Sequence, residues 1–479
     1  MKLRDYQEDC ISKMRLALTS GEKRLLVKAP CSFGKTIVFC AIAQMAKEKG
    51  NSVLIVMDSV FLVKQTVEKL MHFTSDVGVY CGSLNRKELK TITVGTIQSL
   101  KKIDFSILIV DEVHSGYSRT SKFLKDFQGI IIGFTATPYN AKGMAIYGED
   151  KFFNKLTYAM TANELLERKI ITPMVYGCEK EETKISLKNV SIVNGDYKES
   201  ELQKVYEIEK DKVKSQVIDM IARTSSRKKI IIMCTGIDHA NYVESILDSS
   251  LAYHSGLKLD DREERINKFK SGKVKYLIGV MAIYKGLDIP SVDCITNMRP
   301  TRSKSFYCQL AGRGVRYFEG KLDCLFLDYG QTVETLGFYE DITESIRKDS
   351  KGIAPEFYPK KCPACLALVK PQIKICECGY IFKVVITDKL EMEAFTRNNL
   401  NEVDVTDIVI FKKHSEKSAK IQIYADNYCY EVFYPTQHDF GRIRFHAHSK
   451  AIKVGSRIKF KRNSGNFWEI VAIWNGKEL

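Results

Sequence analysis

The chain of 479 residues lacks any apolar run that approaches ~18 residues, the length that a membrane-spanning helix needs. Near its start it has no apolar segment of the kind that a secretory signal peptide carries, and it has no long internal repeat and no low-complexity tract. Its 14 cysteines are scattered, apart from four between residues 362 and 378, so they do not form a disulfide framework. These absences exclude a membrane protein and lead us to expect a protein of a reducing cytosol.

Positive charge is present in excess. The chain has 74 Lys and Arg against 58 Asp and Glu, which gives a formal net charge of +16. Such a balance favours a polyanionic partner, and without a membrane segment we expect that partner to be nucleic acid. The hydrophobic content of 44% is enough for sizeable cores, and the length predicts about three domains.

Short apolar runs alternate with amphipathic stretches through the first 340 residues. The runs are uninterrupted and rich in β-branched residues, which is typical of parallel strands buried on both faces of a sheet. With the helical stretches between them, they predict βαβ architecture. They fall into two series, at 24–28, 52–56, 92–95, 107–110 and 130–134, and at 229–234, 251–253, 276–280, 292–295 and 324–327.

We therefore predict two tandem α/β domains with parallel sheets, at residues 1–178 and 216–350, joined by a charged connector at 179–215. From residue 351 the alternation of apolar runs and amphipathic stretches stops. A cysteine-bearing segment at 351–390 precedes a basic segment at 391–479, where alternating patterns such as 419–424 and 456–460 predict a small antiparallel β domain.

The segment Ala29-Pro30-Cys31-Ser32-Phe33-Gly34-Lys35-Thr36 lies between the first predicted strand and a predicted helix. Backbone N–H groups of such a loop and the helix N-terminus favour a bound phosphate. Lys35 is expected to reach the β- and γ-phosphates of a nucleotide, and Thr36 to ligate Mg²⁺. Ala29 stands where the first glycine of the usual phosphate-loop pattern is expected, so the assignment depends on Gly34-Lys35-Thr36 between strand and helix.

The predicted strand 107–110 ends in Asp111-Glu112-Val113-His114. Carboxylates at the carboxyl edge of a parallel sheet lie where ligands bind. We expect Asp111 to hold Mg²⁺ through water and Glu112 to act as the general base on the attacking water. His114, taken alone, is an ordinary polar residue.

The ordered set of motifs over residues 1–340 resembles a superfamily 2 helicase of the DExH type, in the branch that includes restriction-enzyme motors and phage DNA-remodelling helicases. The cytosol of a bacterium or of a phage-infected cell is the compartment that this resemblance implies. The matching segments are Leu3-Arg4-Asp5-Tyr6-Gln7, the phosphate loop, Val94-Gly95-Thr96-Ile97-Gln98-Ser99-Leu100, Asp111 to His114, Phe134-Thr135-Ala136-Thr137-Pro138, Lys285-Gly286-Leu287-Asp288-Ile289-Pro290 and Gln309-Leu310-Ala311-Gly312-Arg313-Gly314-Val315-Arg316.

The resemblance implies that both α/β domains are RecA-like, and it implies a role for each segment. Arg4 and Gln7 would read adenine, and Gly286 and Asp288 would belong to the nucleotide site of the second domain. His114 would meet Gln309, while Thr135 and Thr137 would couple hydrolysis to domain movement. Arg313 and Arg316 would include the arginine finger, which acts only when the two domains close around ATP.

Contacts to the nucleic-acid backbone are implied for Thr96 and Gln98 in the first domain and for His254 and Ser255 in the second. Small hydroxyl and amide groups suit contact with phosphates without regard to sequence. His254 is equally well explained as a hydrogen-bonded turn residue. A basic loop with Arg299, Arg302 and Lys304 has a solvated surface as its alternative explanation.

Four cysteines form a C-x₂-C…C-x-C set: Cys362, Cys365, Cys376 and Cys378. Four thiolates at this spacing can surround Zn²⁺ tetrahedrally and replace a hydrophobic core in a small ribbon. The second half is one residue shorter than the usual knuckle. Four thiolates leave no open coordination position, so we expect the zinc to be structural.

The last domain combines positive charge with aromatic residues. From 403 to 479 there are 13 Lys and Arg against 8 Asp and Glu, with aromatics between them at 442–446, 459–462 and 467–468. Aromatic stacking platforms beside cations suit single-stranded nucleic acid. Alternatively, the aromatics fill the core of the domain while the lysines keep it soluble.

The sequence thus predicts an ATP-dependent DNA helicase or translocase that unwinds or remodels forked or branched DNA in replication or recombination, using ATP, Mg²⁺ and a structural Zn²⁺. An RNA helicase with the same motor and a double-strand DNA translocase that serves a separate nuclease are the alternatives. A scaffold that binds nucleic acid without hydrolysing ATP is disfavoured because Lys35, Asp111, Glu112, Gln309, Arg313 and Arg316 are all present.

Overall fold

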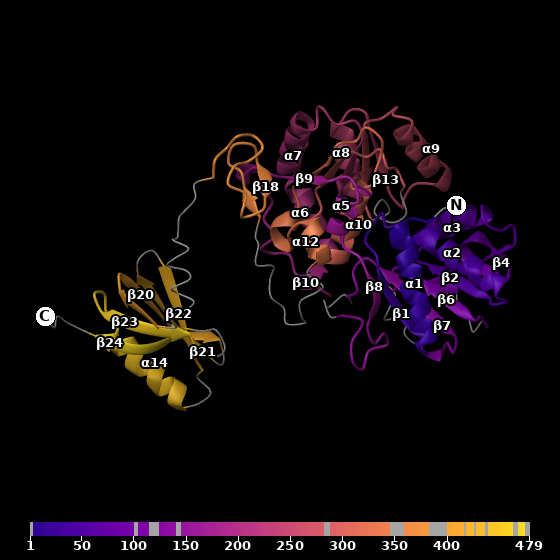
Figure 1. Cartoon of the computed structure of the whole chain (residues 1–479). Coiled ribbons are helices and arrows are strands. Elements are labelled where there is room, and N and C mark those ends of the chain that lie inside the picture. The colour runs from indigo at the N-terminus through magenta and orange to yellow at the C-terminus, as the bar shows by residue number, and fades with distance from the viewer. Residues whose placement is uncertain are drawn as a thin grey trace. The chain divides into compact units, whose positions relative to one another are not determined.

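The structure is a computed structural model, and it describes residues 3–99, 104–114, 124–139, 145–281, 288–344, 359–382, 400–415, 418–425, 428–435, 439–462 and 468–474. The chain divides into two compact units, Met1–Phe382 and Lys383–Leu479 (Figure 1). In the described part of the chain, no helix combines the length and apolarity that a membrane crossing requires.

The first domain of the larger unit is built on an eight-stranded sheet with the order β4-β3-β5-β2-β6-β7-β1-β8. Its strands pair in parallel, except that β4 pairs with β3 in the antiparallel direction. The elements of this domain are α1 (Asp5–Thr19), β1 (Arg24–Lys28), α2 (Lys35–Glu48), β2 (Val53–Met57), α3 (Val60–Met71), β3 (Val77–Cys81), β4 (Arg86–Lys87), β5 (Ile92–Thr96), β6 (Ile107–Val110), β7 (Ile130–Thr135) and β8 (Leu156–Ala159).

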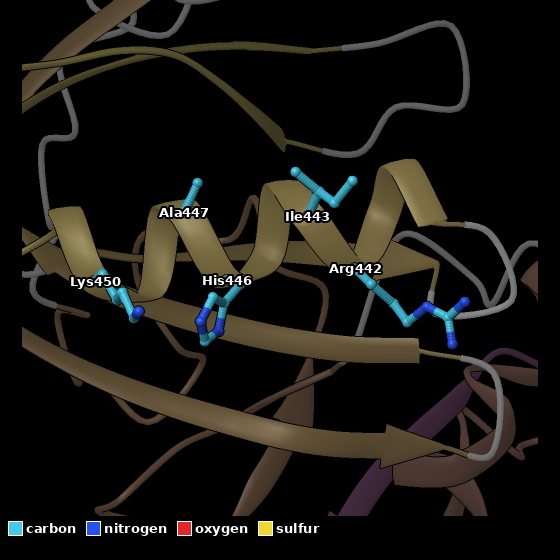
Figure 2. A pocket seen from close by; sticks show the side chains of 5 residues that line it. All are labelled: Arg442, Ile443, His446, Ala447 and Lys450. Carbon is cyan, nitrogen blue, oxygen red and sulfur yellow. The ribbon is translucent and has the colours of Figure 1, made fainter.

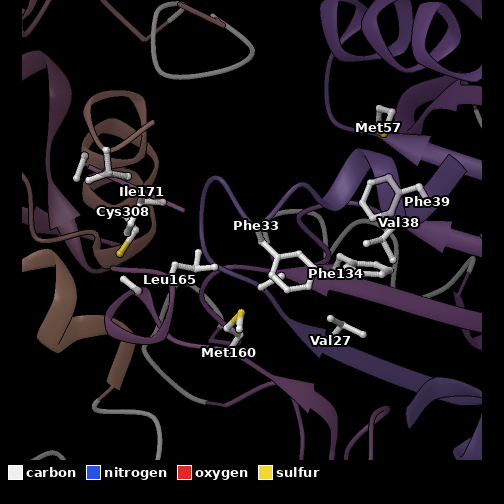
Figure 3. Packing of buried hydrophobic residues seen from close by; sticks show 14 of the residues in the cluster. Val27, Phe33, Val38, Phe39, Met57, Phe134, Met160, Leu165, Ile171 and Cys308 are labelled. Atoms are coloured by element: carbon white, nitrogen blue, oxygen red, sulfur yellow. The ribbon is translucent and has the colours of Figure 1, made fainter. Parts of the chain in front are cut away.

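The central strands of this sheet are apolar along their whole length because both faces are covered. Helices α1, α2 and α3 pack on one face, and the segments around Phe105, Phe127 and Phe153 pack on the other. All five residues of β2 and all four of β6 are buried, as expected for parallel strands covered on both faces. Figure 3 shows part of the larger cluster, in which Phe33 of the loop that follows β1 is buried together with Phe39 and Phe134, whose rings lie 4.6 Å apart. This packing fixes the position of that loop.

The second domain has its own eight-stranded sheet with the order β13-β14-β12-β15-β16-β9-β18-β17. Its elements are α5 (Ala162–Glu167), β9 (Met174–Cys178), β10 (Ile192–Val193), β11 (Asp196–Tyr197), α6 (Glu199–Ile208), α7 (Lys210–Arg223), β12 (Ile230–Met233), α8 (Ile237–Ile246), β13 (Ser250–Tyr253), α9 (Leu259–Lys270), β14 (Tyr276–Gly279), β15 (Cys294–Asn297), α10 (Lys304–Gly314), β16 (Cys324–Asp328), α11 (Thr332–Leu336), α12 (Tyr339–Glu344), β17 (Lys360–Lys361) and β18 (Ala367–Val369). The tandem parallel sheets confirm the predicted fold class.

The boundaries between the domains differ from the sequence prediction. Strand β9, which we had placed in the first domain, pairs in parallel with β16 of the second sheet. The predicted connector 179–215 contains helices α6 and α7, which pack into the core of the second domain through Leu202, Tyr206, Val213 and Val217. The many charged residues of these helices lie on their outer faces, and this charge led to the wrong prediction of a connector.

The cysteine-bearing segment also extends the second sheet. Its short strand β18 pairs antiparallel with β9, and β17 pairs with β18. The described part of this segment is 359–382, so the rest of the predicted range 351–390 lies outside the described residues.

The smaller unit contains two three-stranded antiparallel sheets, β19-β23-β24 and β20-β21-β22, which confirms the predicted small β domain. Its elements are β19 (Leu400–Asp404), β20 (Asp407–Ser415), β21 (Ser418–Ala425), β22 (Tyr428–Pro435), α14 (Asp439–Ala451), β23 (Arg457–Arg462) and β24 (Trp468–Trp474). Helix α14 was not predicted. It packs through Phe445 and His448, whose rings both meet Tyr434.

The aromatic residues of this unit serve mainly as core. Phe460 is fully buried and stacks on Tyr430 at a ring separation of 4.5 Å, and Phe445 packs against the same cluster. They are therefore not exposed stacking platforms, contrary to the first interpretation. Phe467 and the side chain of Trp468 lie outside the described residues.

Candidate active site between the two parallel sheets

The phosphate loop begins directly after β1 and ends at helix α2, as the sequence predicted. Residues 29–34 form the turn, and Lys35 and Thr36 open the helix. Ser32 and Gly34 have positive φ values of 68° and 87°, which curl the backbone into a cradle. The buried hydroxyl of Ser32 has no hydrogen-bond partner among the described residues. The loop therefore has the backbone shape and the available polar group of a phosphate site.

The N-terminal residues Arg4 to Gln7 pack against this loop. The Gln7 amide donates to the Phe33 carbonyl at 3.0 Å and accepts from the Arg4 N–H at 3.0 Å. The Tyr6 ring lies 5.1 Å from that of Phe33. The structure thus brings Arg4 and Gln7, the two predicted adenine-reading residues, alongside the loop.

Lys35 forms an ion pair with the two predicted acidic residues, Asp111 and Glu112. Lys35 Nζ contacts Glu112 Oε1, and it lies 3.6 Å from Asp111 Oδ1. Burial alone would lower the pKa of Lys35, but the carboxylates of Glu112 and Asp111 raise it above its ordinary value. Burial raises the pKa of Asp111 to about 6, whereas Lys35 and His114 outweigh burial at Glu112 and hold its pKa below the usual value. Glu112 is therefore ionised at neutral pH.

A series of polar contacts leads from Glu112 through His114 to the second domain. His114 Nδ1 lies 3.4 Å from Glu112 Oε2 and 2.7 Å from Thr135 Oγ1, and His114 Nε2 lies 2.6 Å from Ser305 Oγ. Ser305 is in the first turn of α10, one turn before Gln309, the partner that the resemblance had implied. Sequence reasoning missed Ser305 because its position on a helix gives no sign of what lies opposite.

The direction of these bonds follows from the donors available. The Thr135 hydroxyl donates its one hydrogen to the Thr137 carbonyl at 2.9 Å and also accepts from the Thr137 N–H at 3.0 Å. Towards His114 the Thr135 oxygen can therefore only accept, so Nδ1 carries a proton. The Ser305 hydroxyl is the partner of Nε2, and it donates to a neutral ring or accepts from a protonated one.

The other end of α10 brings the predicted arginines to the phosphate loop. Cys31 Sγ lies 3.5 Å from the Cys308 carbonyl, and a β-carbon built on Gly312 would lie 2.4 Å from the Cys31 sulfur. Burial, followed by the charge of Arg316, lowers the pKa of Arg313 to about 9. Arg316 pairs with Asp288 at 2.6 Å. Gln309 lies half-buried on the same helix, and Gly286 lies outside the described residues.

The predicted nucleic-acid contacts differ in exposure. Thr96 is buried and its hydroxyl bonds to Ser99 at 2.8 Å, whereas Gln98 is exposed. His254 is buried as well, and Ser255 beside it is exposed. Gln98 and Ser255 are thus the members of the set whose side chains face solvent.

The side chains of the four cysteines converge on one point. Their sulfur atoms all lie within 4.8 Å of one another, with Cys362–Cys378 at 3.7 Å and Cys365–Cys376 at 3.6 Å. Four sulfurs around Zn²⁺ at bond lengths of about 2.3 Å would be separated by about 3.8 Å, far more than the ~2.05 Å of a disulfide. The donor set and its spacing fit a tetrahedral metal site.

Comparison with known families agrees with this geometry. The family model described as "Type III restriction enzyme, res subunit" matches residues 1–140, and the model described as "Helicase conserved C-terminal domain" matches residues 212–318. The chain belongs to the superfamily 2 helicases, in the restriction-motor branch. The two matched regions fall in the two parallel-sheet domains of the structure.

Known helicases and a phage protein are similar to this chain in sequence. The mitochondrial ATP-dependent helicase irc3 of Schizosaccharomyces pombe is 26% identical over 377 residues, which cover 72% of this chain and 60% of the yeast protein. A 51.5 kDa protein of a Lactococcus phage is 25% identical over 385 residues, which cover 77% of this chain and 81% of the phage protein. The chain therefore spans less than two thirds of the yeast relative.

Solved structures share the fold. The type ISP restriction-modification enzyme LlaBIII, solved bound to DNA, aligns with a TM-score of 0.51 at 17% identity. The alignment covers 72% of this chain and 29% of that enzyme.

The contact between Gly312 and Cys31 gives a direct test of this geometry. Gly312→Ala adds a β-carbon where Cys31 already lies, so we expect kcat for ATP hydrolysis to fall about tenfold or more because α10 can no longer approach the loop. Alanine in place of glycine would otherwise favour a helix by about 1 kcal/mol. Steady-state kinetics of the variant and of Cys31→Gly/Gly312→Ala, with Cys31→Gly alone as control, measure the effect.

The double variant should recover part of the lost rate because it removes the atoms that clash. If Gly312→Ala hydrolyses ATP like the wild type, α10 does not pack against the phosphate loop in the active enzyme.

Proposed function

We propose that the chain is an ATP-dependent DNA helicase or translocase that unwinds or remodels forked or branched DNA in replication or recombination, acting in the cytosol. The observation that carries the proposal is the path of polar contacts from Glu112 through His114 to Ser305 on α10, in which His114 lies 3.4 Å from Glu112 Oε2 and 2.6 Å from Ser305 Oγ. This path connects the group that would activate water in the first domain to the helix that bears Arg313 and Arg316 in the second. A motor that converts hydrolysis into domain movement needs such a connection.

ATP would reorganise the ion pair of Lys35. The phosphates of a nucleotide in the loop 29–36 compete with Glu112 for the Lys35 ammonium, because both are anions within reach of one cation. Transfer of Lys35 to the phosphates leaves Glu112 ionised and available as general base for a water at the γ-phosphate.

The arginines of α10 would complete the site when the domains close. The lowered pKa of Arg313 reflects burial and the nearby charge of Arg316, and a phosphate placed beside both guanidinium groups relieves this repulsion. ATP binding is therefore expected to favour the closed state, and loss of the γ-phosphate to favour opening.

Two metals belong to the proposal. Thr36 and Asp111 would hold Mg²⁺, which would neutralise charge on the phosphates. The four cysteines would hold a structural Zn²⁺ beside β17 and β18. Since β18 pairs with β9, this metal would stabilise the edge of the second motor sheet.

DNA is favoured over RNA as the partner by the kinship with restriction-enzyme motors and by LlaBIII, which was solved bound to DNA. The test is to measure ATP hydrolysis and strand separation with no nucleic acid, single-stranded DNA, forked DNA and an RNA of matched sequence. We expect forked DNA to stimulate hydrolysis most. Glu112→Gln should keep ATP binding but lose about a hundredfold or more in hydrolysis, because general bases typically contribute 10²–10⁴-fold.

Equal or stronger stimulation by RNA would replace the DNA proposal with the RNA-helicase alternative. Hydrolysis at the wild-type rate in Glu112→Gln would contradict the assignment of the general base.

The smaller unit is proposed to add a nucleic-acid contact. Residues 440–462 contain eight Lys and Arg and no Asp or Glu. On α14, Arg442, His446 and Lys450 recur every fourth residue, and Figure 2 shows them along one side of the helix with Ile443 and Ala447 beside them. These five residues line a surface hollow, and all are exposed. A line of cations at one-turn spacing suits the phosphates of a nucleic-acid backbone.

Removal of two of these cations should reduce the dependence of DNA binding on salt. For Arg442→Ala/Lys450→Ala we expect weaker binding, with the slope of log K against log salt smaller by about 1.4–1.8, since each phosphate contact contributes about 0.7–0.9. Fluorescence anisotropy over a salt series measures the slope. Arg457→Ala is the control, because its guanidinium already pairs with Asp404 at 2.8 and 2.9 Å. An unchanged slope in the double variant would remove α14 from the DNA contact.

A further inference from the structure

The short hairpin of β10 and β11 carries two apolar side chains at its tip. Ile192 and Val193 are 53% and 50% exposed. The strands are joined by Asn194 and Gly195, whose φ values of 52° and 86° are those of a tight two-residue hairpin turn. β-branched side chains on such a turn have few conformations to lose on binding. The tip is therefore a small, stiff, apolar projection.

The base of the hairpin is fixed to the loop before α10. Asp196 accepts a hydrogen bond from the Thr301 hydroxyl at 2.9 Å and another from the Arg302 N–H at 2.7 Å. Thr301 Oγ1 in turn accepts from the Ser303 N–H, and Ser303 caps α10 through the Phe306 N–H. The hairpin and the first turn of α10 are thus tied together by consecutive hydrogen bonds.

The same first turn contains Ser305, which bonds to His114. A continuous path therefore runs from Glu112 to the hairpin through His114, Ser305 and the capped end of α10. A change in the nucleotide site that shifts α10 relative to the first domain must move the hairpin as well, because Asp196 holds it to that helix.

The hairpin lies at the carboxyl edge of the second sheet. The loop that holds Asp196 follows β15, and His254 follows β13 in the same parallel series. Parallel strands end at one edge, so the hairpin shares this edge with Ser255, one of the two exposed candidate contacts to nucleic acid. Arg302 and Lys304, next to the anchor, are exposed as well. Cations near an apolar tip suit a ligand that has both a polyanionic backbone and flat apolar faces.

We propose that the β10–β11 hairpin is the contact of the second motor domain with the fork of a nucleic-acid duplex, where Ile192 and Val193 form an apolar tip that enters between the strands at the terminal base pair. The inference rests on the proposed function. Two half-exposed side chains are too small for a stable protein interface, which buries about 800 Å² on each partner. Successive strand residues point to opposite faces, so the tip is apolar on both sides, and the movement of α10 would drive it between the two strands.

The test compares two double truncations, which remove five and six carbon atoms. Ile192→Ala/Val193→Ala removes the tip, and Ile208→Ala/Ile218→Ala removes two exposed isoleucines from α6 and α7 of the same domain as the matched control. Strand separation of forked DNA and ATP hydrolysis stimulated by single-stranded DNA are measured for both variants and for the wild type. We expect the tip variant to separate strands about tenfold more slowly, with stimulated hydrolysis within about twofold of the control.

A second variant tests the anchor. Asp196→Ala keeps the tip but frees it from α10, so it should also slow strand separation while ATP hydrolysis continues. The proposal is overturned if the tip variant separates forks as fast as the control, or if its hydrolysis falls in parallel with strand separation. Failure of the wild type to separate any fork would instead contradict the proposed function.

Discussion

The buried ion pair between Lys35 and the carboxylates of Asp111 and Glu112 is the interaction on which the active site depends. The three side chains come from the carboxyl edge of one sheet, where β1 and β6 end, and they lie away from bulk water. A buried charge is costly unless it is paired, so each member needs the others until a ligand replaces one of them. A nucleotide with its metal is such a ligand, because it offers anions to Lys35 and a cation to the acids.

Helix α10 links this ion pair to the second domain at two places along its length. Its first turn contacts His114 through Ser305, and its last turn packs Gly312 against Cys31 of the phosphate loop. The eleven residues of α10 therefore contact the candidate nucleotide site at two points, His114 beside the proposed general base and Cys31 in the phosphate loop. The hydrogen bonds before the helix pass the same position to the β10–β11 hairpin. Hydrolysis and the proposed contact with the fork are in this way connected by one rigid element.

The sequence was sufficient to predict what depends on local pattern. Uninterrupted apolar runs gave the central strands, and Gly34-Lys35-Thr36 between strand and helix gave the phosphate loop, because both signals lie within a few consecutive residues. The cysteine spacing gave the metal site for the same reason. The contact of Ser305 with His114 and that of Asp196 with Thr301 join residues more than 100 positions apart, and no local signal distinguishes these side chains from other polar residues. The many charged residues of α6 and α7 obscured the apolar periodicity of the faces that pack in the second domain. Helix α14 was not predicted because basic and aromatic residues alternate in its sequence.

The most direct test of the central claim is a crystal structure of the chain with a non-hydrolysable ATP analogue, Mg²⁺ and forked DNA. The account predicts that Lys35 Nζ leaves Glu112 for the β- and γ-phosphates and that Arg313 reaches the γ-phosphate. It also predicts that α10 and the β10–β11 hairpin stay joined through Asp196. A structure in which Lys35 still pairs with Glu112 beside the bound nucleotide, or in which the hairpin separates from α10, would contradict it.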